Sequence, residues 1–265
     1  MYSYLHRYHA GNFADVHKHI VLVAILNKLR EKSAPFAVLD AFAGEGLYSL
    51  NSEAALKNAE HMNGIEKVWS QSSLPLLAQA YRDVVAGFQP NRDLSVYPGS
   101  PAFIAALLRP QQDKAFLIEG HPNCFSILKQ HFNSNNQIHL HQRDAYEALT
   151  ALLPFKEKRG LVFLDPSYEV KQEYEQLANK ILAIYPRFAN GIYCIWYPIL
   201  KEKHHERLKA IFKQRLDIKQ YHHEFFPTHC PTEGLLGSGL WIINPPWQLD
   251  KQVDDVFKPQ PAEFC

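Results

Sequence analysis

An acidic residue and an aromatic residue follow the apolar run 161–164, with a proline and a serine between them. The run Leu-Val-Phe-Leu is typical of a short buried strand, and Pro166 favours an end to that strand. In open α/β sheets, ligands bind just beyond the carboxyl ends of the strands. Asp165, Pro166 and Tyr168 are therefore candidate catalytic residues, because an acid beside an aromatic ring suits a flat, hydrogen-bonding substrate such as a nucleobase. A proline turn without chemical function explains this pattern equally well.

Three further acidic residues follow predicted strands. Asp40 and Glu119 each end a short apolar run, and Asp144 follows the alternating run 137–141, which indicates a strand near the edge of a sheet. Helical patterns separate these runs, and this alternation predicts a mostly parallel sheet with right-handed crossovers. Because parallel strands end at the same edge, we expect these three acids to gather beside Asp165.

A glycine-containing loop, Ala-Phe-Ala-Gly-Glu-Gly at 41–46, follows Asp40 directly. Glycine at Gly44 and Gly46 lets the backbone approach a ligand closely. The loop is not the G-x-G-x-x-G of dinucleotide-binding proteins, and no Gly-Lys-Ser/Thr phosphate loop is present. These absences weigh against a nucleotide cofactor that is held by its phosphates.

The acids and the loop suit an adenosine-containing cofactor that has no phosphate. The acid of the second strand, Glu119, is where a ribose hydroxyl pair is usually held. Asp144 can accept a hydrogen bond from an exocyclic amine, and Asp40 beside the glycine loop can hold a cationic amino-acid group. S-adenosylmethionine meets all three demands.

The other segments surround this sheet. Apolar spacing predicts a helix over 16–29, with Asn12 or Asp15 as its cap. Residues 51–97 read as a helical insertion of short amphipathic helices without a strand. Ser100 is expected to cap a helix that runs to Leu108. Further helices and strands are predicted over 172–185, 191–198, 202–216, 218–226 and 240–244, and an extended tail from residue 245.

The first 19 residues are rich in His, Arg and Tyr, which favours an arm that faces the substrate. A metal site at His17 and His19 is disfavoured, because residues two apart point to different faces of a helix. The basic segment 201–209 is typical of a solvated helix face. The Asn-Pro-Pro-Trp segment 244–247 reads as a structural turn after the last predicted strand.

Composition bounds the remaining possibilities. The 265 residues are 46% hydrophobic and 21% charged, with a formal net charge of +1, which is typical of one large globular α/β domain. We find no signal peptide, no C-x-x-C pair among four cysteines and no apolar run near the roughly 18 residues that a membrane span needs. We therefore expect a cytoplasmic protein with free thiols and no membrane partner.

Taken in order, these motifs resemble those of class I amino-methyltransferases of the D/N-P-P-Y/F/W group. The rest of the chain is similar to the RlmJ family, and the resemblance covers essentially its whole length. The segments that carry it include Tyr4, 9–12, Asp15, 18–19, 97–101, 191–193, 196–198, 238–239 and 244–247.

The resemblance implies a Rossmann-like methyltransferase fold with a seven-stranded, mostly parallel sheet whose last strand is antiparallel. Residues 1–50 and 98–265 would form this domain, and 51–97 the small helical insertion. The activity it implies is transfer of a methyl group from S-adenosylmethionine to the N6 amine of one adenine in 23S ribosomal RNA. We expect the substrate to be unassembled or partly assembled RNA, and the enzyme to be a monomer without a metal.

Carried over by position, the resemblance places residues in two groups. The expected cofactor contacts are His19, Asp40, Phe42, Gly44, Ser100, Glu119, Asp144, Ala145 and Asp165. The expected RNA contacts are Tyr4, His6, Arg7 and Lys18. The chain departs from the family pattern at Ser167, where a second proline is usual, at Phe42, where a cofactor-contacting His is frequent, and at Ala145, which replaces a Gly.

Two alternatives stay open at this point. The same four-residue motif serves methyltransferases that act on DNA adenine or on protein glutamine. A catalytically inactive RNA-binding protein is the alternative from another class, if Ser167 and Phe42 reflect lost activity. Acids retained at all four strand ends argue against an inactive protein.

Overall fold

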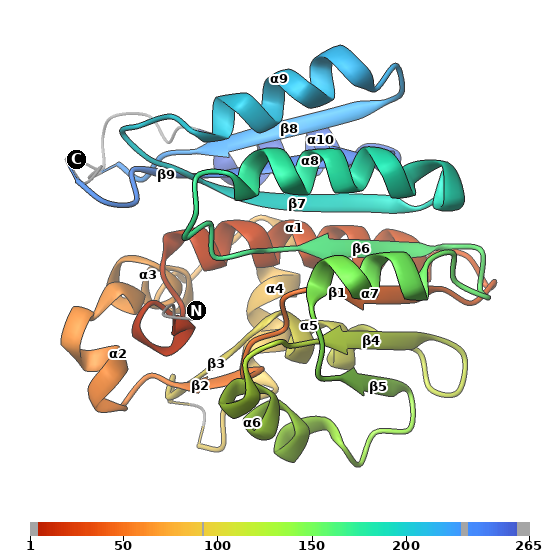
Figure 1. Ribbon diagram of the computed structural model, residues 1–265. Coiled ribbons are helices and arrows are strands. Elements are labelled where there is room, and N and C mark those ends of the chain that lie inside the picture. The colour runs from red at the N-terminus through yellow and green to blue at the C-terminus, as the bar shows by residue number, and fades with distance from the viewer. Residues whose placement is uncertain (1–4, 92, 229–232, 259–265) are drawn as a thin grey trace.

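The computed structural model describes residues 5–91, 93–228 and 233–258 of the chain (Figure 1). Seven strands form one sheet in the order β5-β4-β1-β6-β7-β9-β8, and two short strands, β2 and β3, form a separate antiparallel pair. The strands are β1 Ala37–Asp40, β2 Leu47–Ser49, β3 Val96–Pro98, β4 Lys114–Ile118, β5 Ile138–His141, β6 Gly160–Leu164, β7 Ile192–Ile199, β8 Gln220–Phe225 and β9 Gly237–Ile243.

The large sheet has the predicted mixed topology. Strands β5, β4, β1, β6 and β7 pair in parallel, and in the register of the central strand Asp40 lies between Leu117 and Phe163. The last strand, β9, is antiparallel to both β7 and β8 and lies between them. β5 is an edge strand, as its alternating sequence predicts. This arrangement confirms the Rossmann-like class I methyltransferase fold.

Helices cover both faces of the sheet, which gives three layers (Figure 1). The two core clusters place α1, α4, α5 and α10 on one face, and α7, α8 and α9 on the other. The helices are η1 His6–Tyr8, α1 Phe13–Arg30, α2 Glu53–Asn58, η2 Glu60–Asn63, α3 Ile65–Trp69, α4 Leu76–Ala86, α5 Ser100–Leu107, α6 Pro122–Phe132, α7 Ala145–Leu152, α8 Glu173–Ile184, η3 Tyr185–Phe188, α9 His205–Arg215 and α10 Leu249–Phe257.

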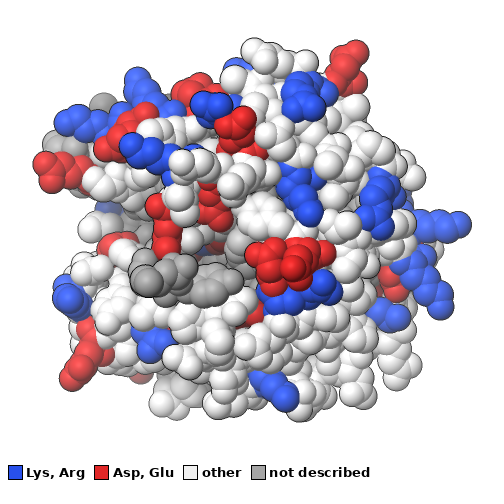
Figure 2. All heavy atoms as spheres, in the orientation of Figure 1, with Lys and Arg blue, Asp and Glu red and all other residues white. Residues whose placement is uncertain are grey.

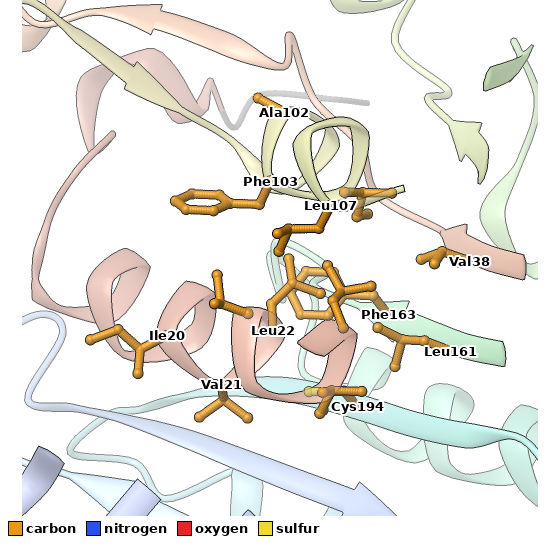
Figure 3. Packing of buried hydrophobic residues seen from close by; sticks show 14 of the residues in the cluster. Ile20, Val21, Leu22, Val38, Ala102, Phe103, Leu107, Leu161, Phe163 and Cys194 are labelled. Atoms are coloured by element: carbon orange, nitrogen blue, oxygen red, sulfur yellow. The ribbon is translucent and has the colours of Figure 1, made fainter. Parts of the chain in front are cut away.

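Helix α1 is the central element of the first face. It is buried on all sides because it lies between the sheet and the helices α4, α5 and α10. Figure 3 shows Leu22 of this helix close to Phe103 of α5 and Phe163 of β6, all fully buried. A helix fixed so firmly by its apolar residues can hold polar side chains at set positions near its N-terminal end. Asn12 caps it by accepting the Asp15 amide at 2.9 Å, one of the two predicted caps.

Three predictions about secondary structure are wrong. Val96–Pro98 is a strand, β3, which three residues are too few to reveal by alternation. The tail from residue 245 is not extended but contains α10, whose Leu249 and Val253 lie one turn apart and pack into the core. Gly99, not Ser100, is the N-cap of α5, so the Ser100 side chain is available for another partner.

The region between β2 and β3 is mainly helical, as predicted, and it contacts the N-terminal segment. Gly11 carbonyl oxygen accepts a hydrogen bond of 2.8 Å from the Ile65 amide at the start of α3. A Cβ atom on Gly64 would collide with the Gly11 carbonyl oxygen, so these two segments of the chain lie backbone against backbone. Within the described parts of the chain, no helix is long and apolar enough to cross a membrane.

Candidate active site

The carboxyl edge of the parallel strands opens into a cavity of about 520 Å³. Asp40 ends β1, Glu119 follows β4, Asp144 follows β5 and Asp165 follows β6, and these strands are neighbours in the sheet. The sheet therefore brings the four acids together, as the sequence predicts. On the face shown in Figure 2, acidic side chains lie in the hollow at the left, where these strands end.

Asp40 lies beneath this cavity and does not line it. Its side chain is fully buried, accepts from the Phe42 amide at 3.4 Å and is hydrogen-bonded to the Ser100 hydroxyl. Burial raises the pKa of Asp40 to about 7, and the hydrogen bonds from Ser100 and Phe42 oppose that rise only in part. Ser100 itself lines the cavity, so Asp40 is separated from the cavity by a neighbouring side chain.

Glu119 holds the glycine loop in place. One carboxylate oxygen accepts from the Gly44 amide at 2.8 Å, and the other accepts from the His121 amide at 2.6 Å. Gly44 and Gly46 have φ angles of 63° and 83°, a left-handed conformation that favours glycine. Glu119 therefore lines the cavity and also holds the glycine loop against it through the Gly44 amide.

Asp144 and Ala145 lie at the first turn of α7 and line the same cavity. Asp144 is the N-cap of this helix and accepts from the Glu147 amide at 2.9 Å. Phe42 lines the cavity from the glycine loop, with its ring centroid 6.3 Å from that of Tyr146. Phe42 thus contributes an apolar wall to the cavity and no hydrogen-bonding group.

Asp165 is paired with a buried lysine. The Lys18 ammonium lies 2.5 Å from Oδ2 of Asp165 and 2.6 Å from Oδ1 of Asp15, and His6 Nε2 lies 2.9 Å from Oδ2 of Asp15. The Asp165 side chain is 15% exposed, whereas that of Lys18 is 5% exposed. Lys18 therefore contacts the candidate catalytic acid and is shielded from solvent, although the sequence predicts an RNA contact for it.

The pKa values in this cluster follow from its charges. Burial alone would raise the pKa of Asp15, but His6 and Lys18 beside it hold that pKa well below its usual range. Burial alone would lower the pKa of Lys18, but Asp15 and Asp165 raise it above its usual value. Lys18 is therefore a permanent cation beside Asp165 and cannot itself take up a proton.

The segment after Asp165 folds over one side of the cavity. Pro166 and Tyr168 are buried, Ser167 is exposed, and all three line the cavity. Tyr168 has a φ of 51° and stacks on Tyr174 with ring centroids 4.2 Å apart, and its hydroxyl donates to the Trp196 carbonyl at 2.7 Å. The Tyr168 hydroxyl is thus already hydrogen-bonded within the protein, and the Tyr168 ring already stacks on another tyrosine.

His19 and the N-terminal residues differ in where they lie. His19 and His6 line the cavity, and His19 Nδ1 is 2.8 Å from the Tyr97 hydroxyl. Arg7 does not line it and pairs with Glu45 of the glycine loop at 2.6 Å. Tyr4 lies outside the described residues. His17 is on the opposite side of α1 from His19, as the spacing predicts, and contacts Ser238 and His223.

Sequence reasoning missed two residues of this site. Asp15 was predicted as a cap, but its carboxylate accepts from Gly11 and pairs with His6 and Lys18. The three-residue spacing between Asp15 and Lys18, on one helix face, was the available signal. Trp196, which lines the cavity from β7, gave no local signal because it stands in a continuous apolar strand.

Two other sequence features lie away from the cavity. In the basic helix α9, Lys209 is buried rather than solvated, and its ammonium bonds to Glu206 at 2.8 Å and to Glu224 at 2.6 Å. The start of the segment 244–247 is a structural turn, as predicted, because the Asn244 amide group donates to two carbonyl oxygens of the loop before β7.

The raised pKa of Asp40 predicts a change of stability with pH. An acid whose pKa is about 7 when folded and about 4 when unfolded binds more protons in the native state, so native stability falls as pH rises through this window. Replacing Asp40 by Asn removes this dependence. From pH 5 to pH 8.5, wild-type protein should lose about 2–3 kcal/mol relative to Asp40→Asn in urea unfolding without cofactor. A pH-independent difference between the two proteins would contradict the assignment.

Together, the sheet order, the glycine loop and the acids at the strand ends define this protein as a class I methyltransferase. The family described as ribosomal RNA large subunit methyltransferase D, RlmJ, matches residues 33–259, and the chain belongs to this RlmJ family.

Relatives and one solved structure agree with this family. The chain is 39% identical to ribosomal RNA large subunit methyltransferase J of Escherichia coli (strain K12) over 260 residues, 97% of this chain and 91% of the relative. It is 36% identical to the protein of the same name from Haemophilus influenzae over 266 residues, covering 97% and 92%. A crystal structure of a Legionella pneumophila protein has a TM-score of 0.88 and 37% identity, with 94% of this chain and 92% of that chain covered.

Proposed function

We propose that this enzyme transfers the methyl group of S-adenosylmethionine to the N6 amine of an adenine in 23S ribosomal RNA. The observation that carries the proposal is the ion-paired Asp165 at the mouth of the cavity, followed directly by Pro166. The names of the two bacterial relatives support large-subunit ribosomal RNA as the substrate class. Membership of the RlmJ methyltransferase family supports S-adenosylmethionine as the cofactor.

The residues of the cavity fit S-adenosylmethionine. Carboxylates at Glu119 and Asp144 suit ribose hydroxyls and an exocyclic amine, and the loop at Gly44 offers close backbone approach without a phosphate-binding lysine. We propose contacts from His19, Phe42, Ser100 and Ala145 in addition, with Asp40 acting through Ser100. When bound, this cofactor supplies an electrophilic methyl group on a sulfonium.

The chain's own task is to prepare a poor nucleophile. The lone pair of an adenine amine is delocalised into the ring, so the nitrogen must be held in a pyramidal geometry to attack. Asp165 and the carbonyl oxygen of Pro166 can each accept one N–H of the amine. Lys18 holds the Asp165 carboxylate in place from behind, and positioning of this kind can lower a barrier by up to ~7–11 kcal/mol.

The target base must leave its stack to reach Asp165, at a cost of a few kcal/mol. Tyr168 lines the cavity beside Asp165 and is proposed to stack on the flipped base, which is worth ~1–3 kcal/mol. We further propose that Tyr4, His6 and Arg7 face the RNA, and that residues 51–97 form an insertion that supports this arm. Lys18 is proposed to act on the RNA only through Asp165.

The test is tritium transfer from labelled cofactor to four substrates: protein-free 23S ribosomal RNA, assembled large subunits, DNA and protein. We expect label in protein-free or partly assembled RNA, on an adenine, with a monomeric cytoplasmic enzyme and no added metal. Label in DNA or protein alone would replace this proposal by one of the alternatives. No label anywhere together with no cofactor binding in calorimetry would indicate an inactive protein.

The effect of a second proline in the Asp-Pro-Ser-Tyr motif can be tested at Ser167. Its side chain is exposed between two buried residues, so a pyrrolidine ring there meets solvent rather than core. Ser167→Pro should therefore leave methyl transfer unchanged or raise it, since proline reduces the freedom of the loop before binding. Steady-state rates of the variant and the wild type on protein-free RNA check this. A large loss would show that the Ser167 hydroxyl takes part.

A further inference from the structure

Trp196 of β7 is placed beside the acid that would receive the amine. The indole is half-buried and lines the cavity, and the Lys18 ammonium lies 5.2 Å from its ring centroid. The same ammonium is 2.5 Å from Asp165. Trp196 therefore contacts the same lysine that is paired with Asp165. It is also a planar aromatic group of the kind on which nucleobases stack.

Hydrogen bonds fix this tryptophan at both ends. Its carbonyl oxygen accepts from the Tyr168 hydroxyl at 2.7 Å, so it is tied to the catalytic segment. Its indole N–H donates to the Ser238 hydroxyl at 2.9 Å. Ser238 lies on β9, next to β7 in the sheet, and pairs with Pro198. The orientation of the ring is thus set by a serine from a different strand.

The serine belongs to a buried chain of polar groups. Ser238 Oγ is 2.8 Å from His17 Nδ1, and His17 Nε2 is 2.9 Å from His223 Nδ1. Ser238 and His17 are both fully buried. All hydrogens can run in one direction, from the indole N–H to Ser238, from its hydroxyl to His17, and from His17 to His223. Each group then has the partner that burial demands.

Such a chain needs a reason, because one acceptor alone would satisfy the indole N–H. Two polar side chains in the core are costly unless they are fully hydrogen-bonded, and a complete network specifies one arrangement of its members. Here the only member that reaches the cavity is Trp196, whereas Ser238 and His17 do not line it. The network therefore specifies the position of one ring in the site.

We propose that Trp196 binds and positions the target base, and that Ser238 and His17 are positioning residues that act through its indole N–H. This inference rests on the proposed RNA substrate. It assigns to the site a base-contacting ring in addition to Tyr168, with the Lys18 ammonium over that ring and Asp165 paired with the ammonium.

The first experiment compares Trp196→Leu and Trp196→Phe with wild-type protein in steady-state methylation of protein-free RNA. Trp196→Leu should lower kcat/KM by roughly 5- to 150-fold, the loss of one stacked base, while cofactor affinity in calorimetry changes less than about twofold. Trp196→Phe keeps a ring and should retain most of the activity. Equal loss in the two variants, or unchanged kcat/KM in Trp196→Leu, would overturn the role of the ring.

The second experiment tests the positioning residues by a double-mutant cycle. Ser238→Ala should lower kcat/KM in the Trp196 background and have no further effect in the Trp196→Phe background, because phenylalanine has no N–H to orient. His17→Phe, which keeps an aromatic ring against Phe257, should behave in the same way. Equal losses in both backgrounds would show a merely structural role and overturn the inference.

The chain contains a matched control. The indole N–H of Trp241, also bound across the sheet, donates to Gln220 at 2.8 Å, but neither residue lines the cavity. Gln220→Ala should leave kcat/KM unchanged. Wild-type protein that fails to label RNA would overturn the proposed function and this inference with it. Labelled RNA together with an unaffected Trp196→Leu would overturn this inference alone.

Discussion

Replacing Asp165 by alanine is expected to abolish methyl transfer, with a loss on the order of 10³-fold or more, because the acceptor that orients the amine is removed. Cofactor affinity should fall much less, by under about tenfold, since Glu119 and the glycine loop form a separate part of the cavity. Single-turnover rates with saturating cofactor and protein-free RNA measure the first effect, and calorimetry measures the second.

Asp144→Ala is the matched control, because it removes another acid from the same edge of the sheet. Its expected signature is the opposite: weaker cofactor binding, and a smaller change in the rate once cofactor is saturating. Asp165→Asn keeps an acceptor oxygen of the same size but presents an amide beside Lys18, so it should lose less activity than Asp165→Ala. Full activity in Asp165→Ala would refute the catalytic assignment.

The location of the site was predictable because it depends on strand ends. Each parallel strand carries its last residues to one edge, so Asp40, Glu119, Asp144 and Asp165 could be grouped without knowing a single contact. The edge position of β5 was predictable from its alternating sequence, whereas the antiparallel last strand was expected only from the family resemblance. Periodicity is a local property of a chain, and the direction of a strand in the sheet is not.

What could not be predicted depends on which side chains meet across the fold. His17 and Ser238 are 221 positions apart, and Lys18 and Asp165 are 147 apart. Nothing in the spacing of a basic, aromatic N-terminus distinguishes a lysine that faces RNA from one that is buried against two carboxylates. The helix α10 was missed because prolines precede it and only Leu249 and Val253 are fully buried on it.

Replacing Lys18 by methionine is expected to affect stability and rate together. Removing one partner of a buried ion pair leaves Asp15 facing Asp165 with less compensation, which costs about 3–5 kcal/mol of unfolding free energy. For a chain of this size, that loss lowers Tm by roughly 6–20 °C. Asp165 loses the group that fixes its carboxylate, and a misplaced catalytic group can cost on the order of 10²-fold in rate.

The two effects of Lys18→Met can be separated. Adding Asp15→Asn removes a buried carboxylate that the lost ammonium compensated, so the double variant should recover part of the Tm but none of the rate, because Asp165 is still without Lys18. Lys28→Met on the same helix removes a lysine that pairs with an exposed Glu31, and it should cost at most about 1 kcal/mol. If the double variant regained both stability and activity, the lysine would serve only to balance Asp15. A rate that stays low while the fold recovers would assign to Lys18 the orientation of Asp165.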